Sequence, residues 1–301
     1  MAQTAATATT DFAGFLKPAE AESYFNQAAR QSVVQSLTRR VPLGINGQEI
    51  PVVTSKPTAS WVSEGGQKPT TNGALGLKSI EPKKLAAITV VSAEVVRANP
   101  GNYVSLFRDQ IAEAFAIAFD AAALHGTNTP FGANNYVGAT TKAVTLGTTA
   151  PASGGIYGDL NGALKLLVDD KKKLTGWAFD PVAEPVLNGA VDLNGRPLFV
   201  DAVYEDTSLS GGRLLRRQAL YGEGVQNENT IGFAGDWSQA VWGAVGGISY
   251  DVSTEATVTI NGTLTSLWEH NLVAIRAEAE YGWLVNDAES FAAINEAASG
   301  D

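Results

Sequence analysis

The chain contains no cysteine and only two histidines, His125 and His270. The missing thiols exclude disulfide bonds, zinc sites with cysteine ligands and thiol catalysis. Two imidazoles are too few for a multi-histidine metal site, and neither histidine stands beside a motif for an activated nucleophile. The titratable residues therefore indicate no enzyme site of ordinary type, and we predict no cofactor and no bound metal.

Positive charge is scarce as well. Lys and Arg number 21 against 31 Asp and Glu, so the formal net charge is -10 and the isoelectric point is about 4.8. A protein that binds nucleic acid through its phosphates needs the opposite sign. The sequence holds no window of about 18 consecutive apolar residues and begins without a basic region and apolar run. We therefore predict no membrane span and no signal peptide, and expect a soluble protein made in a cytoplasm.

Residues 1 to about 45 are predicted to form an arm rather than a domain. The first stretch is rich in Ala and Thr and lacks periodicity, and Phe12, Phe15 and Leu16 follow it. A helix-like segment then spans residues 19–37. Such an arm cannot bury its apolar side chains alone, so it must lie on a surface of this subunit or of a neighbour.

Residues 46–91 are predicted to form a long two-stranded excursion. Ile50 and Val52 alternate with polar or small residues, and Leu85–Val91 is a β-rich return run. Between them, Glu64–Gly73 has the composition of turns and loops throughout. Because a lone hairpin is marginal in water, this excursion also requires a neighbouring surface.

Residues 102–125 carry the strongest helix pattern. Asn102 is an expected N-cap, and Gly126 is an expected stop. At about 1.5 Å per residue this helix would be roughly 35 Å long. Its apolar positions recur every three or four residues and are Val104, Phe107, Ile111, Ala114, Phe115, Ala118 and Ala122.

The remaining chain mixes helix-like and strand-like segments. We expect helices at 159–173 and 182–187, and strands at 177–179 and 197–203. A small antiparallel group is expected at 229–235, 240–245 and 248–252. Residues 272–285 alternate cleanly between apolar and polar positions, which predicts a long strand with one buried face. The fold class is therefore mixed α+β.

The order of these segments resembles the major capsid proteins of tailed bacteriophages, which have the Hong Kong 97 fold. The resemblance runs from about residue 10 to 295 and rests on Trp61–Pro69, Lys83–Glu94, Asn102–Asn128, Leu193–Val200, Gly235–Ser238 and Glu269–Gly282. The first stretch is similar to the tip of the family's extended loop (E-loop). The third resembles its spine helix, and the last resembles its late peripheral-domain strand.

The resemblance implies a division into an N-terminal arm (1–45), an E-loop (46–91), a peripheral domain (92–155, with the spine helix at 102–125), an axial domain (156–260), and a peripheral-domain return strand with the C-terminal segment (261–301). It implies a virion capsid subunit that self-assembles into hexamers and pentamers and encloses double-stranded DNA without sequence-specific binding. A portal and a decoration protein are further implied partners. Because the arm begins almost at Met1, we expect a separate scaffolding protein, or none, and no large cleavage.

Some family members join their subunits by an isopeptide bond between an E-loop lysine and a neighbour's asparagine, with a glutamate as base. The matching positions here are Lys68, Asn271 and Glu278. That chemistry needs a carboxylate desolvated enough to accept the proton of the amine. The same residues also occur in shells without crosslinks, and noncovalent contact is our default expectation. The residues expected to contact neighbouring subunits are Trp61, Glu64, Lys68 and Arg276.

Two alternatives stay open from the sequence. An encapsulin, the shell protein of a bacterial nanocompartment, shares the fold and would hold a cargo enzyme instead of DNA. A soluble enzyme with an unfamiliar site is the second alternative. The absence of converging titratable groups argues against it.

Overall fold

The computed structural model describes residues 32–98, 103–191 and 210–297. Its α-helices are α1 (Val33–Leu37), α2 (Ala93–Ala98), α3 (Tyr103–His125), α4 (Gly155–Asp169) and α5 (Ala183–Asn188). Its strands are β1 (Arg39–Pro42), β2 (Gln48–Ser55), β3 (Ala74–Ile80), β4 (Lys83–Ser92), β5 (Ala143–Thr145), β6 (Gly176–Phe179), β7 (Ser210–Leu214), β8 (Arg217–Tyr221), β9 (Thr230–Gly235), β10 (Ala240–Ala244), β11 (Ser249–Ser253), β12 (Thr257–Ile260), β13 (Thr263–Ser266), β14 (Leu272–Val285) and β15 (Phe291–Asn295).

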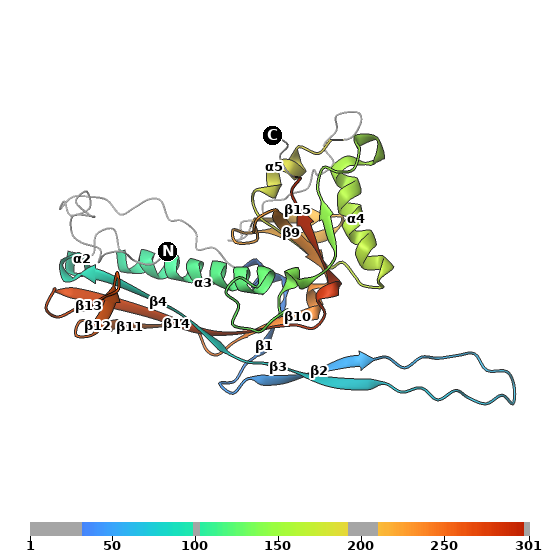
Figure 1. The fold of residues 1–301 in the computed structure, drawn as a ribbon, viewed down its shortest axis with the longest axis horizontal. Coiled ribbons are helices and arrows are strands. Elements are labelled where there is room, and N and C mark those ends of the chain that lie inside the picture. The colour runs from blue at the N-terminus through green and yellow to red at the C-terminus, as the bar shows by residue number, and fades with distance from the viewer. Residues whose placement is uncertain (1–31, 99–102, 192–209, 298–301) are drawn as a thin grey trace.

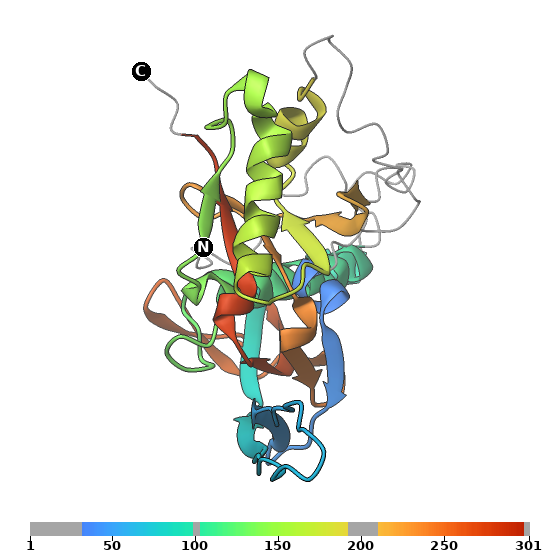
Figure 2. The ribbon, with the colours of Figure 1, turned by 90° about the vertical axis from the view of Figure 1, so that its right-hand side faces the viewer.

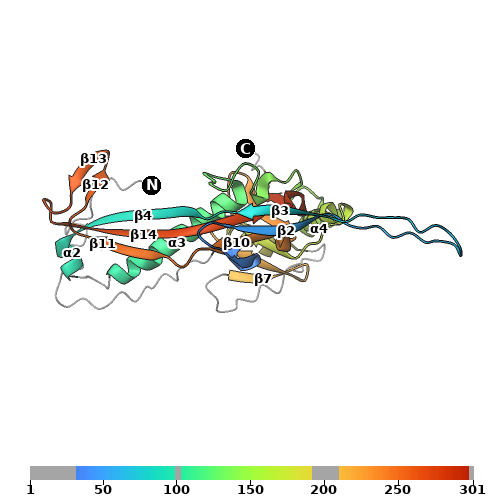
Figure 3. The same cartoon turned by 90° about the horizontal axis from the view of Figure 1, so that it is seen from below.

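A five-stranded sheet, here called the long sheet, is organised around β14. Strand β4 pairs with one edge of β14, while β10 and β11 pair in turn with the other edge, and β1 lies parallel to β10. The α3 helix lies along one face of this sheet (Figures 1 and 3), where Ile111 and Phe115 pack against Ala277 and Ala279. The predicted long helix and the alternating late strand are thus both present and packed together.

A six-stranded sheet stands at one end of the long sheet, with the strand order β5-β15-β9-β6-β8-β7. Helix α4 crosses one of its faces (Figure 2), and Leu160, Ala163 and Leu167 of the helix are fully buried against it. Strand β6 is buried along its whole length. Strand β5 precedes α4 in the sequence and the other strands of this sheet follow it. The sheet therefore forms only when segments distant in the sequence come together.

The β2–β3 hairpin projects from the body beside the six-stranded sheet (Figures 1 and 3). Its base is fastened to the end of β14. The ammonium group of Lys78 donates hydrogen bonds to the carbonyl oxygens of Asn286 (2.5 Å) and Val285 (3.4 Å). Ile80 and Leu43 pack with Leu284 at the same place. The hairpin is therefore anchored at one end and extends freely from there.

The short helix α1 is fixed to α3 by a buried carboxylate. Asp120 of α3 is 1 % exposed and accepts hydrogen bonds from Ser32 Oγ (2.5 Å), Val33 N (2.9 Å) and Val34 N (3.4 Å). Val33 and Val34 themselves are fully buried. Burial raises the pKa of Asp120 to about 7, against the opposing effect of its hydrogen bonds. A titratable group, the Asp120 carboxylate, therefore holds α1, which is the segment through which the predicted arm joins the rest of the subunit.

Two predictions about strand pairing were wrong. The return strand of the hairpin is β3, whereas Leu85–Val91 lies in β4 and pairs with β14, which buries Val90 and Val91. The predicted antiparallel group of 229–252 is divided, since β9 enters the six-stranded sheet while β10 and β11 flank β14. Alternation indicates a strand but does not identify its partner, because pairing is decided by distant segments.

The helix predicted at 159–173 is α4 (Gly155–Asp169), so the prediction placed both of its ends too late in the sequence. Lys171, just after the helix, has a positive φ of 57°. Asp159 does not begin the helix. Its buried carboxylate accepts hydrogen bonds from the backbone N–H groups of Gly147 (2.7 Å) and Thr149 (3.0 Å), and so holds the preceding loop. The Asn102 cap, the strand at 197–203 and most of the helix at 19–37 lie outside the described residues.

Candidate intersubunit contact sites

The tip of the β2–β3 hairpin is a loop that spans residues 56–73. Gly66 N donates to Ser63 O (2.9 Å) in a tight turn, and Thr58 N donates to Thr71 Oγ1 (2.9 Å). Both contacts continue the register of the Ser55–Ala74 pair. Continued along the loop, that register places Trp61 and Lys68 at opposite positions of its two branches.

The residues predicted to contact neighbours at this loop are all exposed. Trp61 is completely exposed, and Glu64 and Lys68 lie in the exposed part of the loop. A fully exposed Trp is unusual, because its large apolar surface is normally covered in a folded protein. The loop therefore presents a large apolar side chain that the described residues do not cover.

The residues predicted on the late strand have partners within their own chain. Asn271 lies just before β14 with a φ of 53°, and its side-chain amide donates to Glu94. Arg276 pairs with Asp251 (2.9 Å between Nη2 and Oδ2). Glu278 lies between two cations, with its carboxylate oxygens 3.4 Å from Lys84 Nζ and 3.7 Å from Arg276 Nε.

The structure does not bring Lys68, Asn271 and Glu278 together within one chain. At about 3.3 Å per strand residue, β14 separates Asn271 from Glu278 by roughly 20 Å. Lys68 belongs to the loop between β2 and β3, and this loop extends away from β14 (Figure 1). These three residues can meet only if they come from different copies of the chain.

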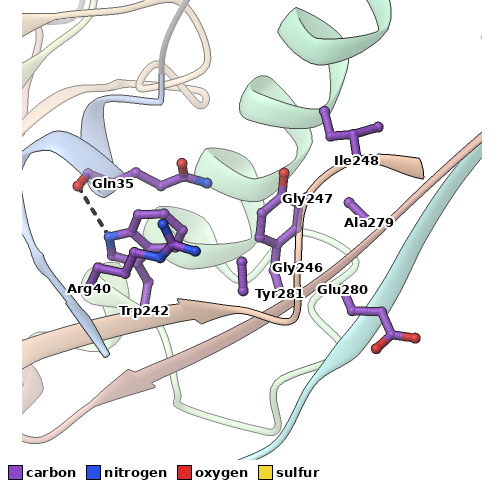
Figure 4. A pocket seen from close by; sticks show the side chains of 10 residues that line it. Gln35, Arg40, Trp242, Gly246, Gly247, Ile248, Ala279, Glu280 and Tyr281 are labelled. Atoms are coloured by element: carbon purple, nitrogen blue, oxygen red, sulfur yellow. Dashed lines mark hydrogen bonds between the residues drawn. The ribbon is translucent and has the colours of Figure 1, made fainter. Parts of the chain in front are cut away.

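A narrow groove opens where β10 meets β11 beside α1 (Figure 4). Gln35 O accepts a hydrogen bond from Trp242 Nε1 (3.2 Å), and the guanidinium of Arg40 lies over the Trp242 ring at 5.3 Å from its centroid. Gly246, with φ of +74°, forms part of the bulge that leaves the groove open. Its lining combines aromatic rings with charged residues of both signs, because Glu280 lines it as well as Arg40.

Three further titratable groups, His125, His270 and Asp180, lie within hydrogen-bonding distance of backbone groups. His125 ends α3 with Nε2 2.8 Å from Val225 O, and His270 Nδ1 is 2.9 Å from Ser266 O. Asp180 accepts from the backbone N–H groups of Val182 (3.1 Å) and Gln226 (3.2 Å). Within the described residues no three His, Cys, Asp or Glu side chains are grouped to hold a metal ion, and none of the helices there is long and apolar enough to cross a membrane.

Sequence reasoning missed one exposed feature at the opposite end of the molecule. Leu264 and Trp268, in and beside the β12–β13 hairpin, are 74 % and 76 % exposed. Their only sequence signal is a Trp that follows a Thr-rich hairpin, and that signal equally fits a buried residue. Both are large apolar side chains that the described residues leave exposed.

The described chain thus combines a long helix on a long sheet, a side sheet with its own core, and a projecting hairpin with an exposed tip. Residues 13–295 match the phage capsid family. The chain belongs to this family, so it is a structural protein of a phage capsid and not an enzyme.

Curated relatives agree with that assignment. The chain is 45% identical over 308 aligned positions to a probable major capsid protein of Mycobacterium phage D29, which covers 99% of this chain and 95% of that protein. It is 43% identical to the corresponding protein of Mycobacterium phage L5, over 95% of this chain and 91% of the relative.

Solved structures share the fold at low sequence identity. A chain from Gordonia phage Cozz matches with a TM-score of 0.75 and 23% identity, over 96% of this chain and 94% of that one. A chain from Mycobacterium phage Cain matches with a TM-score of 0.77 and 17% identity, over 98% and 100%. The predicted α+β fold is thus confirmed, and it is the fold of these phage chains.

Proposed function

We propose that this chain is the major subunit of an icosahedral phage head, assembled as hexamers and pentamers that enclose double-stranded DNA. The named relatives support this role, since two of them are described as probable major capsid proteins. The acidic composition supports a container that does not grip the genome, because an acidic wall and DNA phosphates repel each other.

The exposed loop tip around Trp61 is the main structural support for this function. The loop has a defined turn, yet no described residue covers its largest apolar side chain. Burial of such a side chain against another subunit supplies the free energy that assembly requires. Many copies add these modest contacts together, so the closed shell is far more stable than one interface.

The domain division inferred from the resemblance stands as part of this proposal. The arm, the E-loop, a peripheral domain on α3 and β14, and an axial domain near the capsomer centre would each have a separate part in the shell. Sheet membership suggests one refinement. Residues 240–253 pair with β14 and would move with the peripheral domain, although they fall inside the 156–260 range.

The further partners are a portal, a decoration protein and a separate scaffolding protein, with assembly in the cytoplasm of the host bacterium. Electron microscopy of the purified particle tests the proposal against the nanocompartment alternative. We expect a large closed shell with a portal vertex and a DNA-filled interior in particles from infected cells. A small shell of uniform size that holds protein cargo and no DNA would overturn it.

Boiling the purified shells in SDS tests whether the subunits are covalently joined. Because the Asn271 amide already donates to Glu94 and Glu278 is already ion-paired, we expect noncovalent contacts and a single band at the chain mass of 31.5 kDa. A ladder of higher bands that disappears in Lys68→Ala shells would contradict this expectation. Lys56→Ala, at the other end of the same loop, is the matched control.

A further inference from the structure

Six asparagines of this chain are followed directly by a glycine. The pairs that the structure describes are Asn46–Gly47, Asn72–Gly73, Asn161–Gly162, Asn188–Gly189 and Asn261–Gly262, whereas Asn194 lies outside the described residues. Such a pair can react with itself, because the backbone nitrogen of the glycine can close a ring on the side-chain amide carbon of the asparagine. Glycine has no Cβ to obstruct this approach. The composition of the pairs is the same, so the fold decides which of them can react.

Ring closure places two conditions on the backbone. The glycine nitrogen must lose its proton and attack, and a hydrogen bond from that N–H to a carbonyl oxygen opposes this because it holds the proton and the nitrogen in place. The asparagine must also rotate about its Cα–C bond until its side-chain carbon reaches the nitrogen. A pair fixed in regular structure is therefore protected, while a pair in an unbonded segment can react.

In three of the described pairs the glycine nitrogen is already a donor. Gly47 N donates to Gly44 O (3.0 Å), and Gly189 N donates to Pro185 O (2.9 Å) at the end of α5. Gly162 lies inside α4, where each backbone N–H donates to the carbonyl oxygen four residues earlier. Reaction at any of these pairs would first have to break a hydrogen bond of the fold.

The pair at 261–262 is fixed in a different way. Asn261 and Gly262 have φ of 52° and 79° and form the two-residue turn between β12 and β13, where Ile260 pairs with Thr263. Positive φ at both positions is the conformation of the type I′ turn, which matches the twist of the two strands. Rotation of Asn261 out of this conformation would separate the strands, so the hairpin protects this pair.

The pair at 72–73 has none of these restraints. Asn72 and Gly73 are both exposed and lie outside any helix or strand. Neither forms a hydrogen bond with any residue that the structure describes. They link Thr71, whose Oγ1 accepts from Thr58 N (2.9 Å), to Ala74, the first residue of β3. The reactive pair is thus an unbonded link between two held residues.

We propose that Asn72 is a site of spontaneous deamidation in the folded, unassembled subunit. Gly73 N loses its proton and forms a bond to Cγ of Asn72, the bond from Cγ to the side-chain nitrogen breaks, and ammonia leaves with the proton. Water then opens the resulting succinimide at either carbonyl and yields aspartate or isoaspartate. One water is consumed and one ammonia is released, so the step needs no enzyme and no redox partner.

The conversion changes both the charge and the backbone of the loop. Each product adds a carboxylate to a chain whose net charge is already -10. Isoaspartate also adds one carbon to the main chain between Thr71 and Ala74. Since both of these residues are held by the opposite branch of the hairpin, the longer link cannot keep both contacts unchanged. This modification goes beyond the proposed function, because it requires no second copy of the chain.

Peptide mass spectrometry of the purified, unassembled chain after incubation at mildly alkaline pH tests the proposal. In the folded chain we expect the peptide with Asn72 to convert to aspartate and isoaspartate, and the peptides with Asn46 and Asn261 to remain intact. In urea the fold no longer protects any pair, so all three peptides should convert at similar rates. The comparison within one digest separates the effect of the fold from that of the sequence.

Gly73→Ala tests whether the glycine nitrogen is the attacking atom. A Cβ at this position would meet only Pro57 Cδ (3.4 Å) and Ser55 O (3.7 Å), and φ is not positive, so the variant should fold. It should slow the conversion of Asn72 at least about tenfold, because the new methyl group obstructs the approach. Gly247→Ala, at an open position, is the matched control and should leave the rate unchanged.

Three results would overturn the proposal. If Asn72 converts in urea and stays intact in the folded chain, the loop is held as firmly as the other pairs. If Asn261 or Asn46 converts as fast as Asn72 in the folded chain, the fold does not select the site. If Gly73→Ala converts at the wild-type rate, the glycine nitrogen is not the nucleophile. None of these results bears on whether the chain forms shells.

Discussion

Replacing Asp120 with Ala is expected to lower the free energy of unfolding by about 3 kcal/mol, as measured by denaturant unfolding of the unassembled subunit. Three donors from Ser32, Val33 and Val34 converge on this buried carboxylate. With Ala in its place, buried N–H and O–H groups lose their acceptors, and each loss costs about 1–3 kcal/mol. The attachment of α1 to α3 would weaken with them.

The matched control is Asp120→Asn, which keeps an acceptor and has no charge to bury. The folded pKa of Asp120 is about 7, and its ordinary value is 3.8. Between these values the folded chain binds more protons than the unfolded chain, so this residue makes the wild type lose stability as pH rises from about 4 through 7. The Asn variant should lack that loss. Equal pH profiles for the two proteins would contradict the role assigned to Asp120.

Gly235→Ala is expected to destabilise the six-stranded sheet by about 3 kcal/mol, the upper end of the usual range for an overpacked core. A Cβ at this position would stand 2.3 Å from Phe291 Cδ1 and 2.8 Å from Ser290 O. The second contact is with backbone, which cannot turn aside. Phe291 is fully buried against Trp237, so the ring has little room to yield.

Gly247→Ala is the matched control for this substitution. Gly247 has open space around its Cβ position and no positive φ, so the change should alter the unfolding free energy by less than about 0.5 kcal/mol. Thermal unfolding of both variants against the wild type gives the comparison. A Gly235→Ala protein as stable as the control would mean that β9 and β15 are packed less tightly than described.

The elements that sequence reasoning predicted well are those with local causes. The predicted helix at 102–125 matches α3 because its apolar stripe repeats over many turns. The strand at 272–285 matches β14 because Arg276 remains exposed between buried Ile275 and Ala277. Both patterns are written in consecutive residues and need no information from the rest of the chain.

The features that sequence reasoning missed depend on distant partners. The pairing of β4 with β14 joins residues nearly two hundred positions apart, and nothing in Leu85–Val91 specifies that partner. Asp120 is one carboxylate within an apolar helix, and only the folded chain brings Ser32 to it. Trp268 could equally have been buried. The uncovered loop around Trp61 was predictable, because turn residues around a Trp provide no local way to bury it.

We infer that the loop between β2 and β3 serves assembly and does not contribute to the folding of its own subunit. Replacing residues 56–73 with Asn-Gly tests it most directly, because Ser55 and Ala74 are paired and a two-residue turn can join them. We predict an unassembled subunit with unchanged circular dichroism and unfolding midpoint that forms no closed shells in electron micrographs. If this variant formed closed shells at wild-type yield, the loop would not be needed for assembly.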